Sequence, residues 1–453
     1  MSTNQVPVYP KPNHHPLQTD MANESVSLFS GKIDIVQNDK QLPGFDVSIY
    51  LQWLPTPSLR FDMSGIPYGV HLAIGLCILR IIDFDNDIRA TIAGQRTSIN
   101  TKTGYQSSAS GWLNEVVVRP ETAMVKYSLF LLPNFDCPSG AGLTYPDGST
   151  RWARLILLAQ GWKITLDQVD NHTDLIETLK SSSGYGVTHI GRIEREDETE
   201  YCANDITRIL AGLGRYFSFC SGSWTGPLLA RGFNSNDGQV WERWDTNRIS
   251  PYQYHSSWMD PHCENHCRNP LPGFLKLWLD DEWHEIIDQA IHWYVEANAQ
   301  AGSIEGSIML TQTAFELLAS AILVEQFSWL SNDGYDKVSA ADRLRLLLRW
   351  AGIPTTIPSE LEALVRCANE FNWPDAPDAL IQVRNTITHP KKKNRDKSNK
   401  YSSEVRHDIW QMGLWYLELC LLRLFDYQGT YGKRLSFRYA GQVEQVPWTI
   451  AEK

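Results

Sequence analysis

The sequence IQVRNTITHP, residues 381–390, places an arginine, an amide and a histidine within six positions, as Arg384, Asn385 and His389. An arginine guanidinium is a permanently charged planar fork that fits a phosphate. Histidine is the side chain whose ordinary pKa lets it take and give protons near neutral pH. The stretch therefore predicts a site that cleaves RNA and needs neither a metal ion nor a cofactor.

The same stretch closes a predicted helix. Pro377 and Asp378 indicate the helix start, and apolar residues then recur at helical intervals, at Ala379, Leu380, Val383 and Ile387. On an ideal helix Arg384 and His389 point about 140° apart, so one helix does not aim both at one phosphate. Two arrangements resolve this conflict. Pro390 can move His389 out of the helix, or a second subunit can supply one of the two residues.

Spacing alone does not select this stretch, because a similar interval separates Arg248 from His255. Pro251 and the aromatic and amide residues beside it favour a loop or strand there. The helical context therefore favours Arg384.

The composition predicts a soluble globular protein of two or three domains. The chain has 453 residues, of which 42% are hydrophobic and 21% charged. Its eight cysteines are scattered without a framework, which indicates a reduced, cytoplasmic protein. We expect residues 1–24 to be a disordered segment and not a signal peptide. The apolar stretch 70–82 is too short to span a bilayer, so we expect no membrane partner.

A basic run follows the histidine in a chain of net charge −11. Six positive charges fall within residues 390–400, and RNA binding is assigned to four of them, Lys391, Lys392, Lys393 and Arg395. A solvated loop is the plain alternative, because most like-charge runs are no more than that. Beside a phosphate-cutting residue, such a run would attract a polyanion.

The chain order predicts an α+β protein. Residues 25–260 form a β-rich domain, a sandwich or partly closed barrel, with one amphipathic helix after Asn204. Residues 279–427 show the periodicity of six helices, which makes a bundle. Residues 428–453 form a tail with a hairpin that turns at Ala440 and Gly441.

With RNTITH placed late in such a bundle, the C-terminal third resembles the HEPN superfamily of metal-independent ribonucleases. The stretch LTQTAFELL (310–318), the Asn after the Arg, and THIGRIER (188–195) in the β-rich half are similar to the ApeA-type anti-phage HEPN proteins. The likeness covers residues 280–427 for HEPN and is weaker in the N-terminal half.

The resemblance implies an endoribonuclease effector of anti-phage defence, acting by abortive infection, whose site forms between two HEPN domains of a homodimer or higher oligomer. His389 would act as acid or base, Arg384 would stabilise the transferring phosphate, and Asn385 would orient His389 or the phosphate. Glu316 could hold Arg384 in place, the alternative being a surface carboxylate. The RNA could be tRNA or phage or host transcripts, and a phage component could be the trigger. The alternative function is a catalytically silent HEPN-like sensor whose β-rich domain recognises a ligand.

Residues 262–267, HCENHC, contain the two histidines and two cysteines of a structural zinc site. Four ligands within six residues can hardly surround one ion, and Pro261 and Pro270 indicate a loop. We therefore predict no metal and no cofactor.

Overall fold

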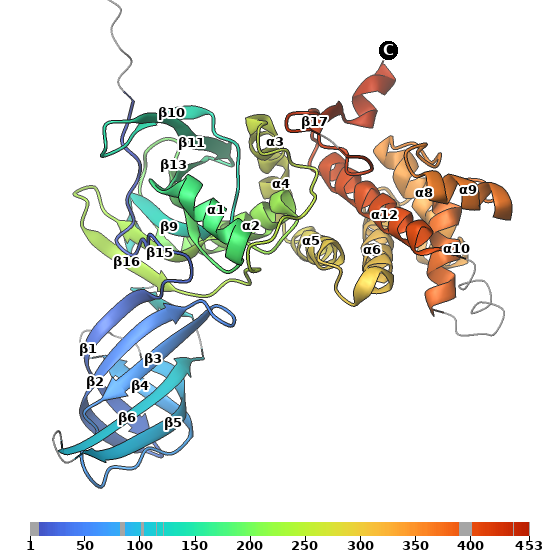
Figure 1. Cartoon of the computed structure of the whole chain (residues 1–453). Coiled ribbons are helices and arrows are strands. Elements are labelled where there is room, and N and C mark those ends of the chain that lie inside the picture. Colours follow the sequence, from blue (N-terminus) through green and yellow to red (C-terminus); the bar gives the residue numbers. More distant parts are fainter. Residues whose placement is uncertain are drawn as a thin grey trace, which may run out of the picture.

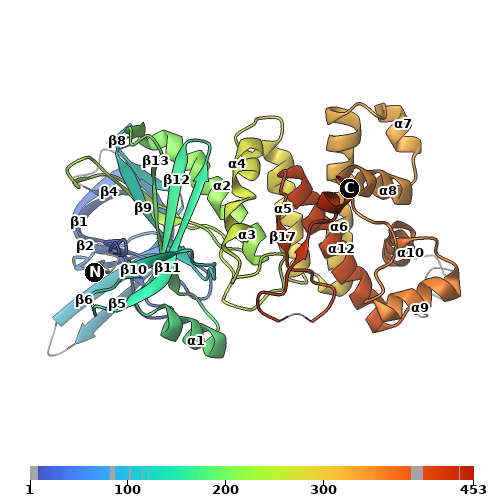
Figure 2. The ribbon, with the colours of Figure 1, turned by 90° about the horizontal axis from the view of Figure 1, so that it is seen from above.

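A computed structural model describes residues 9–81, 87–100, 104–114, 116–120, 122–388, 401–437 and 439–452. Strands dominate these residues up to Trp244, and helices dominate from Glu264 to Leu424. Figures 1 and 2 show a barrel, a large sheet with two helices, and a helical bundle. The predicted α+β class, with a β-rich region before a helical region, is confirmed.

The first six strands close into a barrel in the order β1-β2-β3-β6-β5-β4. Alternate residues of each strand point inward and form an apolar core that includes Ile49, Phe61 and Ile92. Asn38 and Asp39 both have positive φ and make the tight turn between the first two strands. The strands are β1 (Val26–Gln37), β2 (Lys40–Gln52), β3 (Ser58–Ser64), β4 (Gly75–Ile81), β5 (Ile88–Asn100) and β6 (Gly104–Leu113).

An open, antiparallel sheet of eight strands follows, in the order β10-β11-β12-β13-β9-β15-β16-β7. Helix α2 (Ala203–Ser221) is the predicted amphipathic helix, and α1 (His172–Ser182) precedes β13. The strands are β7 (Val117–Arg119), β9 (Tyr127–Pro133), β10 (Ala141–Thr144), β11 (Thr150–Ala159), β12 (Trp162–Gln168), β13 (Val187–Arg195), β15 (Leu228–Phe233) and β16 (Gln239–Trp244). A two-stranded pair, β8 (Met124–Val125) and β14 (Tyr201–Cys202), lies beside it. The β-rich region is therefore a fully closed barrel plus a separate sheet, where a sandwich or partly closed barrel was expected.

The bundle contains the six predicted helices and four shorter elements. Ser339 caps α8, since its hydroxyl accepts a hydrogen bond from the Asp342 amide at 3.2 Å, and the cap is a local signal in the sequence. The predicted helices are α5 (His284–Asn298), α6 (Ser303–Ser320) with its π-helical end η1 (Ala321–Gln326), α8 (Ala340–Ala351), α9 (Glu362–Phe371), α10 (Ala376–Thr388) and α12 (Ser403–Leu424). The others are α3 (Glu264–Arg268), α4 (Leu271–Trp278), α7 (Asn332–Lys337) and the 3-10 helix η2 (Pro447–Glu452).

The bundle and the large sheet share one hydrophobic core through α2. Phe130 of the sheet, Phe217 of α2 and Ile291 of α5 belong to the same buried cluster. Gly212 lets α2 approach α4 closely, because a Cβ at this position would meet the Trp278 ring at 2.7 Å. Figure 2 shows α2 and α4 between the sheet and the bundle.

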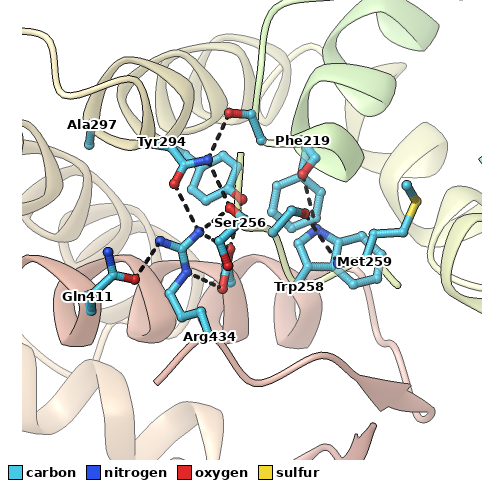
Figure 3. Close-up of polar contacts among 12 residues, drawn as sticks. Phe219, Ser256, Trp258, Met259, Tyr294, Ala297, Gln411 and Arg434 are labelled. Atoms are coloured by element: carbon cyan, nitrogen blue, oxygen red, sulfur yellow. Dashed lines mark hydrogen bonds and ion pairs between the residues drawn. The ribbon is translucent and has the colours of Figure 1, made fainter. Parts of the chain in front are cut away.

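The tail is fixed to the bundle by a buried ion pair (Figure 3). Arg434 and Glu418 are 1% and 0% exposed, and Arg434 Nη2 lies 2.9 Å from a Glu418 carboxylate oxygen. Arg434 also donates to the carbonyl of Ser256 and to Asn298 Oδ1, while the Tyr294 hydroxyl donates to Glu418. β17 (Thr430–Tyr431) pairs with β18 (Glu444–Gln445), so the tail doubles back as predicted.

The expectation of a disordered N-terminal segment is wrong for residues 9–24, while residues 1–8 lie outside the described part. Asn13 donates two hydrogen bonds, of 2.7 and 2.8 Å, to the carboxylate of Asp167 in β12. His15 is fully buried. These long-range polar contacts hold a proline-rich segment that has little local structure of its own.

One helical span, Ser303–Gln326, is long and apolar enough to cross a membrane. Its apolar window is 61% buried among the other helices, as in the core helix of a soluble protein.

Candidate functional site at the end of α10

The helix that carries Arg384 and Asn385 is firmly anchored. At its N-terminal end, Asp375 accepts a hydrogen bond from the Asp378 amide at 3.0 Å and one from Arg345 Nη2 at 2.9 Å. Leu380 and Val383 are fully buried on its inner face. Helix α10 is thus held by a capping carboxylate at its first turn and by an apolar face along its length.

Arg384 and Asn385 lie beside each other in that last turn. Arg384 Nη1 donates to Asn385 Oδ1 at 3.2 Å, and both side chains are half-buried. Arg384 Nε is buried and has no hydrogen-bond partner among the residues that the structure describes. A buried donor without a partner is costly, so this nitrogen would gain from an added acceptor such as an ordered water.

His389, Lys391, Lys392, Lys393 and Arg395 lie outside the described residues. Their position relative to Arg384 therefore stays a prediction. The described chain runs in α10 to Thr388 and resumes at Tyr401, where Ser402 caps α12 by accepting from the Val405 amide at 3.3 Å. By connectivity, the histidine and the basic run join the end of α10 to the start of α12.

Glu316 has different partners from the one expected. Its carboxylate accepts hydrogen bonds from Gln312 at 3.0 Å, Tyr335 at 3.2 Å and Arg343 at 2.9 Å. The expectation that Glu316 holds Arg384 is therefore corrected. α6 points this carboxylate toward α7 and α8, where it fixes Arg343 over the Tyr335 ring.

Helix α6 brings a buried polar pair from the stretch LTQTAFELL, to which no role was assigned from the sequence. Thr311 and Gln312 are 1% and 2% exposed, and Gln312 Oε1 has no hydrogen-bond partner among the described residues. Gly413 lets three helices meet here, because a Cβ on it would lie 3.2 Å from Thr311 Oγ1 and 3.7 Å from Leu380. The only signal in the sequence was polar residues in an apolar helix, and α6 thus contributes unsatisfied polarity near α10.

The competing Arg248–His255 interval is not a comparable site. Arg248 forms an ion pair with Glu296 at 2.8 Å and lies over the Trp224 ring. Burial lowers the pKa of His255, and the charge of Arg434 lowers it further. The Arg248 guanidinium is therefore already used to join the β-rich region to α5.

His266, from the zinc-like HCENHC stretch, is fully buried and uses both ring nitrogens in the protein. Nδ1 accepts from the Asp260 amide at 3.0 Å, and Nε2 lies 3.0 Å from the Thr430 hydroxyl. Cys267 is also fully buried, in the hydrophobic core. These contacts give the stretch a structural role between a loop and the tail.

Comparison with known proteins gives two family matches. Residues 280–445 match the YopA C-terminal domain, and residues 120–255 match the YopA central domain. The SPbeta prophage-derived uncharacterized protein YopA of Bacillus subtilis (strain 168) is 24% identical over 443 residues, which cover 94% of this chain and 95% of the relative. No solved structure matches the chain. The chain is thus similar to YopA over nearly its whole length, and the interval between the two matched regions falls where strands give way to helices.

Proposed function

We propose that this protein is a cytoplasmic, metal-independent endoribonuclease of the HEPN type that acts in anti-phage defence. The observation that carries the proposal is the pair Arg384 and Asn385 on an anchored helix end, with a buried guanidinium nitrogen still free of any described partner. His389 and the basic run follow directly in the sequence. The prophage origin of the relative YopA is compatible with a role in conflict between phages and their hosts.

The proposed chemistry uses the substrate's own nucleophile. In RNA the 2′-OH lies next to the phosphate, so proximity is built into the substrate. His389 would remove the proton of this hydroxyl or protonate the leaving 5′-oxygen. Arg384 would stabilise the charge that develops on the phosphate oxygens, and Asn385 would keep the guanidinium oriented through the bond between them.

The first prediction is cleavage of RNA by the purified full chain in EDTA, with 2′,3′-cyclic phosphate ends. His389→Ala should lower the rate by at least about a hundredfold, because it removes the proton-transfer group. His407→Ala is the matched control, since His407 is an exposed histidine of the same bundle. Cleavage that His389→Ala leaves unchanged, or that EDTA abolishes, would overturn the proposed chemistry.

The second prediction concerns a site shared between two copies. Arg384→Ala and His389→Ala should each be inactive alone, yet their mixture should recover activity. One of the two sites in the mixed dimer combines an unmutated Arg384 with an unmutated His389. The measurement is cleavage after co-expression with two different affinity tags. A protein that cleaves RNA while light scattering shows a monomer would instead favour a single-chain site.

The second candidate function is the catalytically silent sensor. It is favoured by a hollow on the outer face of the barrel, which is lined by residues of the barrel alone. In that case RNA cleavage would be missing, while ligand binding by the barrel would remain.

A further inference from the structure

The outer face of the barrel carries rows of small polar side chains. Strand register places one row across five strands, and these neighbours are Ser30, Ser48, Asp62, Ser110 and Gly94. The four side chains of this row that are not glycine are exposed to solvent. The side chains of this row are small, and the face above them is hollowed. The hollow has a volume of about 920 Å³.

The hollow continues toward the free end of the barrel. A second hollow of about 1100 Å³ lies between the loop after β3 and the β5–β6 hairpin, and both are lined by Ser64, Arg96 and Ser108. A register shift between Ile92 and Gly94 marks a bulge in β5 at this point, a device that re-aims strands beside binding sites. Figure 1 shows β5 and β6 on the part of the barrel that projects away from the bundle. The two hollows form one elongated groove.

The groove offers directional polar groups, and one exposed ring lies at its border. The Tyr50 hydroxyl donates to Asp62 at 2.9 Å, which orients this carboxylate. Arg96 makes no hydrogen bond or ion pair with any residue that the structure describes, so its guanidinium is free to bind. Trp112, which is 40% exposed, follows Ser110 by two residues on the same face of β6 and so borders the groove, in the row of Arg60. An exposed indole beside oriented polar groups can stack on the apolar face of a ligand while its neighbours bind the edges.

The charge of the barrel argues against a polyanion as the ligand. Residues 25–114 contain seven basic and seven acidic side chains. Binding of nucleic acids depends on cations that neutralise phosphates, and this face places the carboxylates of Asp46 and Asp62 in the groove itself. A neutral ligand with many hydroxyl groups meets no such repulsion.

We propose that the groove on the β1-β2-β3-β6-β5 face binds a neutral oligosaccharide. Serine hydroxyls both donate and accept hydrogen bonds, as sugar hydroxyls do, and Asp62 and Arg96 provide one strong acceptor and one strong donor. A sugar ring would stack on Trp112 at the border of the groove. This inference does not depend on the proposed nuclease.

The test uses the full chain and defined neutral hexasaccharides of glucose, N-acetylglucosamine and mannose, with calorimetry as the readout. Two variants probe the groove. Trp112→Ala removes the ring, and Ser110→Tyr fills the hollow. Each should weaken the binding of the preferred sugar about tenfold or more, the cost of one lost stacking contact. Trp152→Ala is the matched control, because Trp152 is an exposed tryptophan of the other sheet, 67% exposed.

Far-ultraviolet circular dichroism and thermal melting of each variant separate loss of binding from loss of fold. Wild-type protein that binds none of the three sugars would overturn the proposal. Sugar binding that Ser110→Tyr leaves unchanged, in a folded variant, would also overturn it. Binding of an rU20 oligonucleotide that Trp112→Ala weakens, without any sugar binding, would assign the groove to single-stranded RNA instead.

Discussion

The barrel and the bundle use ion pairs in opposite ways. In the barrel the pair Lys32–Asp46 has side chains that are 62% and 61% exposed. In the bundle the pair Arg434–Glu418 is fully buried and hydrogen-bonded on several sides. Water screens the first pair, while the second stands in a low-dielectric interior where an unpaired charge is very unfavourable. An ion pair therefore contributes little to the stability of the barrel, whereas in the bundle an ion pair fixes the position of the tail.

The largest expected effect comes from breaking the buried pair. Arg434→Met should lower the free energy of unfolding by about 3–5 kcal/mol, because it leaves Glu418 charged and buried without its partner. Urea unfolding followed by tryptophan fluorescence measures the loss. The double variant Arg434→Met with Glu418→Gln removes both charges and should recover a substantial part of it. Equal losses in the single and the double variant would show that the charge of Glu418 is not the cause.

An intermediate effect on stability is expected from the protonation of His15, a residue of the N-terminal segment that is buried against the sheet. Burial, together with the charge of Arg231, lowers its pKa from 6.5 to about 3. The unfolded chain therefore binds a proton below about pH 6.5 that the folded chain binds only near pH 3. Its contribution to stability is complete above pH 6.5 and is lost as the pH falls toward 3, by about 1.4 kcal/mol per pH unit.

His15→Gln should flatten this pH dependence between pH 6 and 4. Unfolding free energies measured at pH 7, 6, 5 and 4 provide the comparison, and His14→Gln is the control because His14 is exposed. Some dependence should remain, since burial also lowers the pKa values of His172 and His189. An unchanged slope in His15→Gln would show that protonation of His15 is not linked to unfolding.

The smallest effect is expected from the exposed pair of the barrel. Lys32→Ala should change the free energy of unfolding by less than about 1 kcal/mol, and the change should shrink further in 0.5 M salt. The same urea titration applies. A loss as large as that of Arg434→Met would remove the contrast between the two regions.

The sequence predicted the helices better than the strands, for a physical reason. In α8, apolar residues at helical intervals and the Ser339 cap are local signals, and both are present in the structure. In β5 and β6 several inward positions carry small or polar residues, such as Ala90, Ser107 and Ala109, so the alternation of apolar and polar residues is weak. These strands, which carry the groove, were therefore missed.

Long-range partners also could not be predicted. Asn13 and Asp167 are 154 residues apart in the chain, and nothing near Asn13 indicates that it has a partner. Glu316 was expected to contact Arg384, but the orientation of α6 gives it to Arg343. The hydrogen bond between Arg384 and Asn385 was not predicted from the sequence, and the geometry of both residues toward His389 remains a prediction.

The shared core around α2 sets a rule for dissecting the chain by recombinant expression. Arg215 of α2 pairs with Asp288 of α5, and Trp278 of α4 donates to the Arg208 carbonyl. A fragment that starts at residue 279 would lack α2 and α4. It would therefore expose the hydrophobic core that they share with the bundle and would aggregate. A cut near residue 116, between the barrel and the sheet, leaves this shared core intact. Fragments and chimaeras should therefore keep α2 with the bundle, even though it lies within the β-rich half of the sequence.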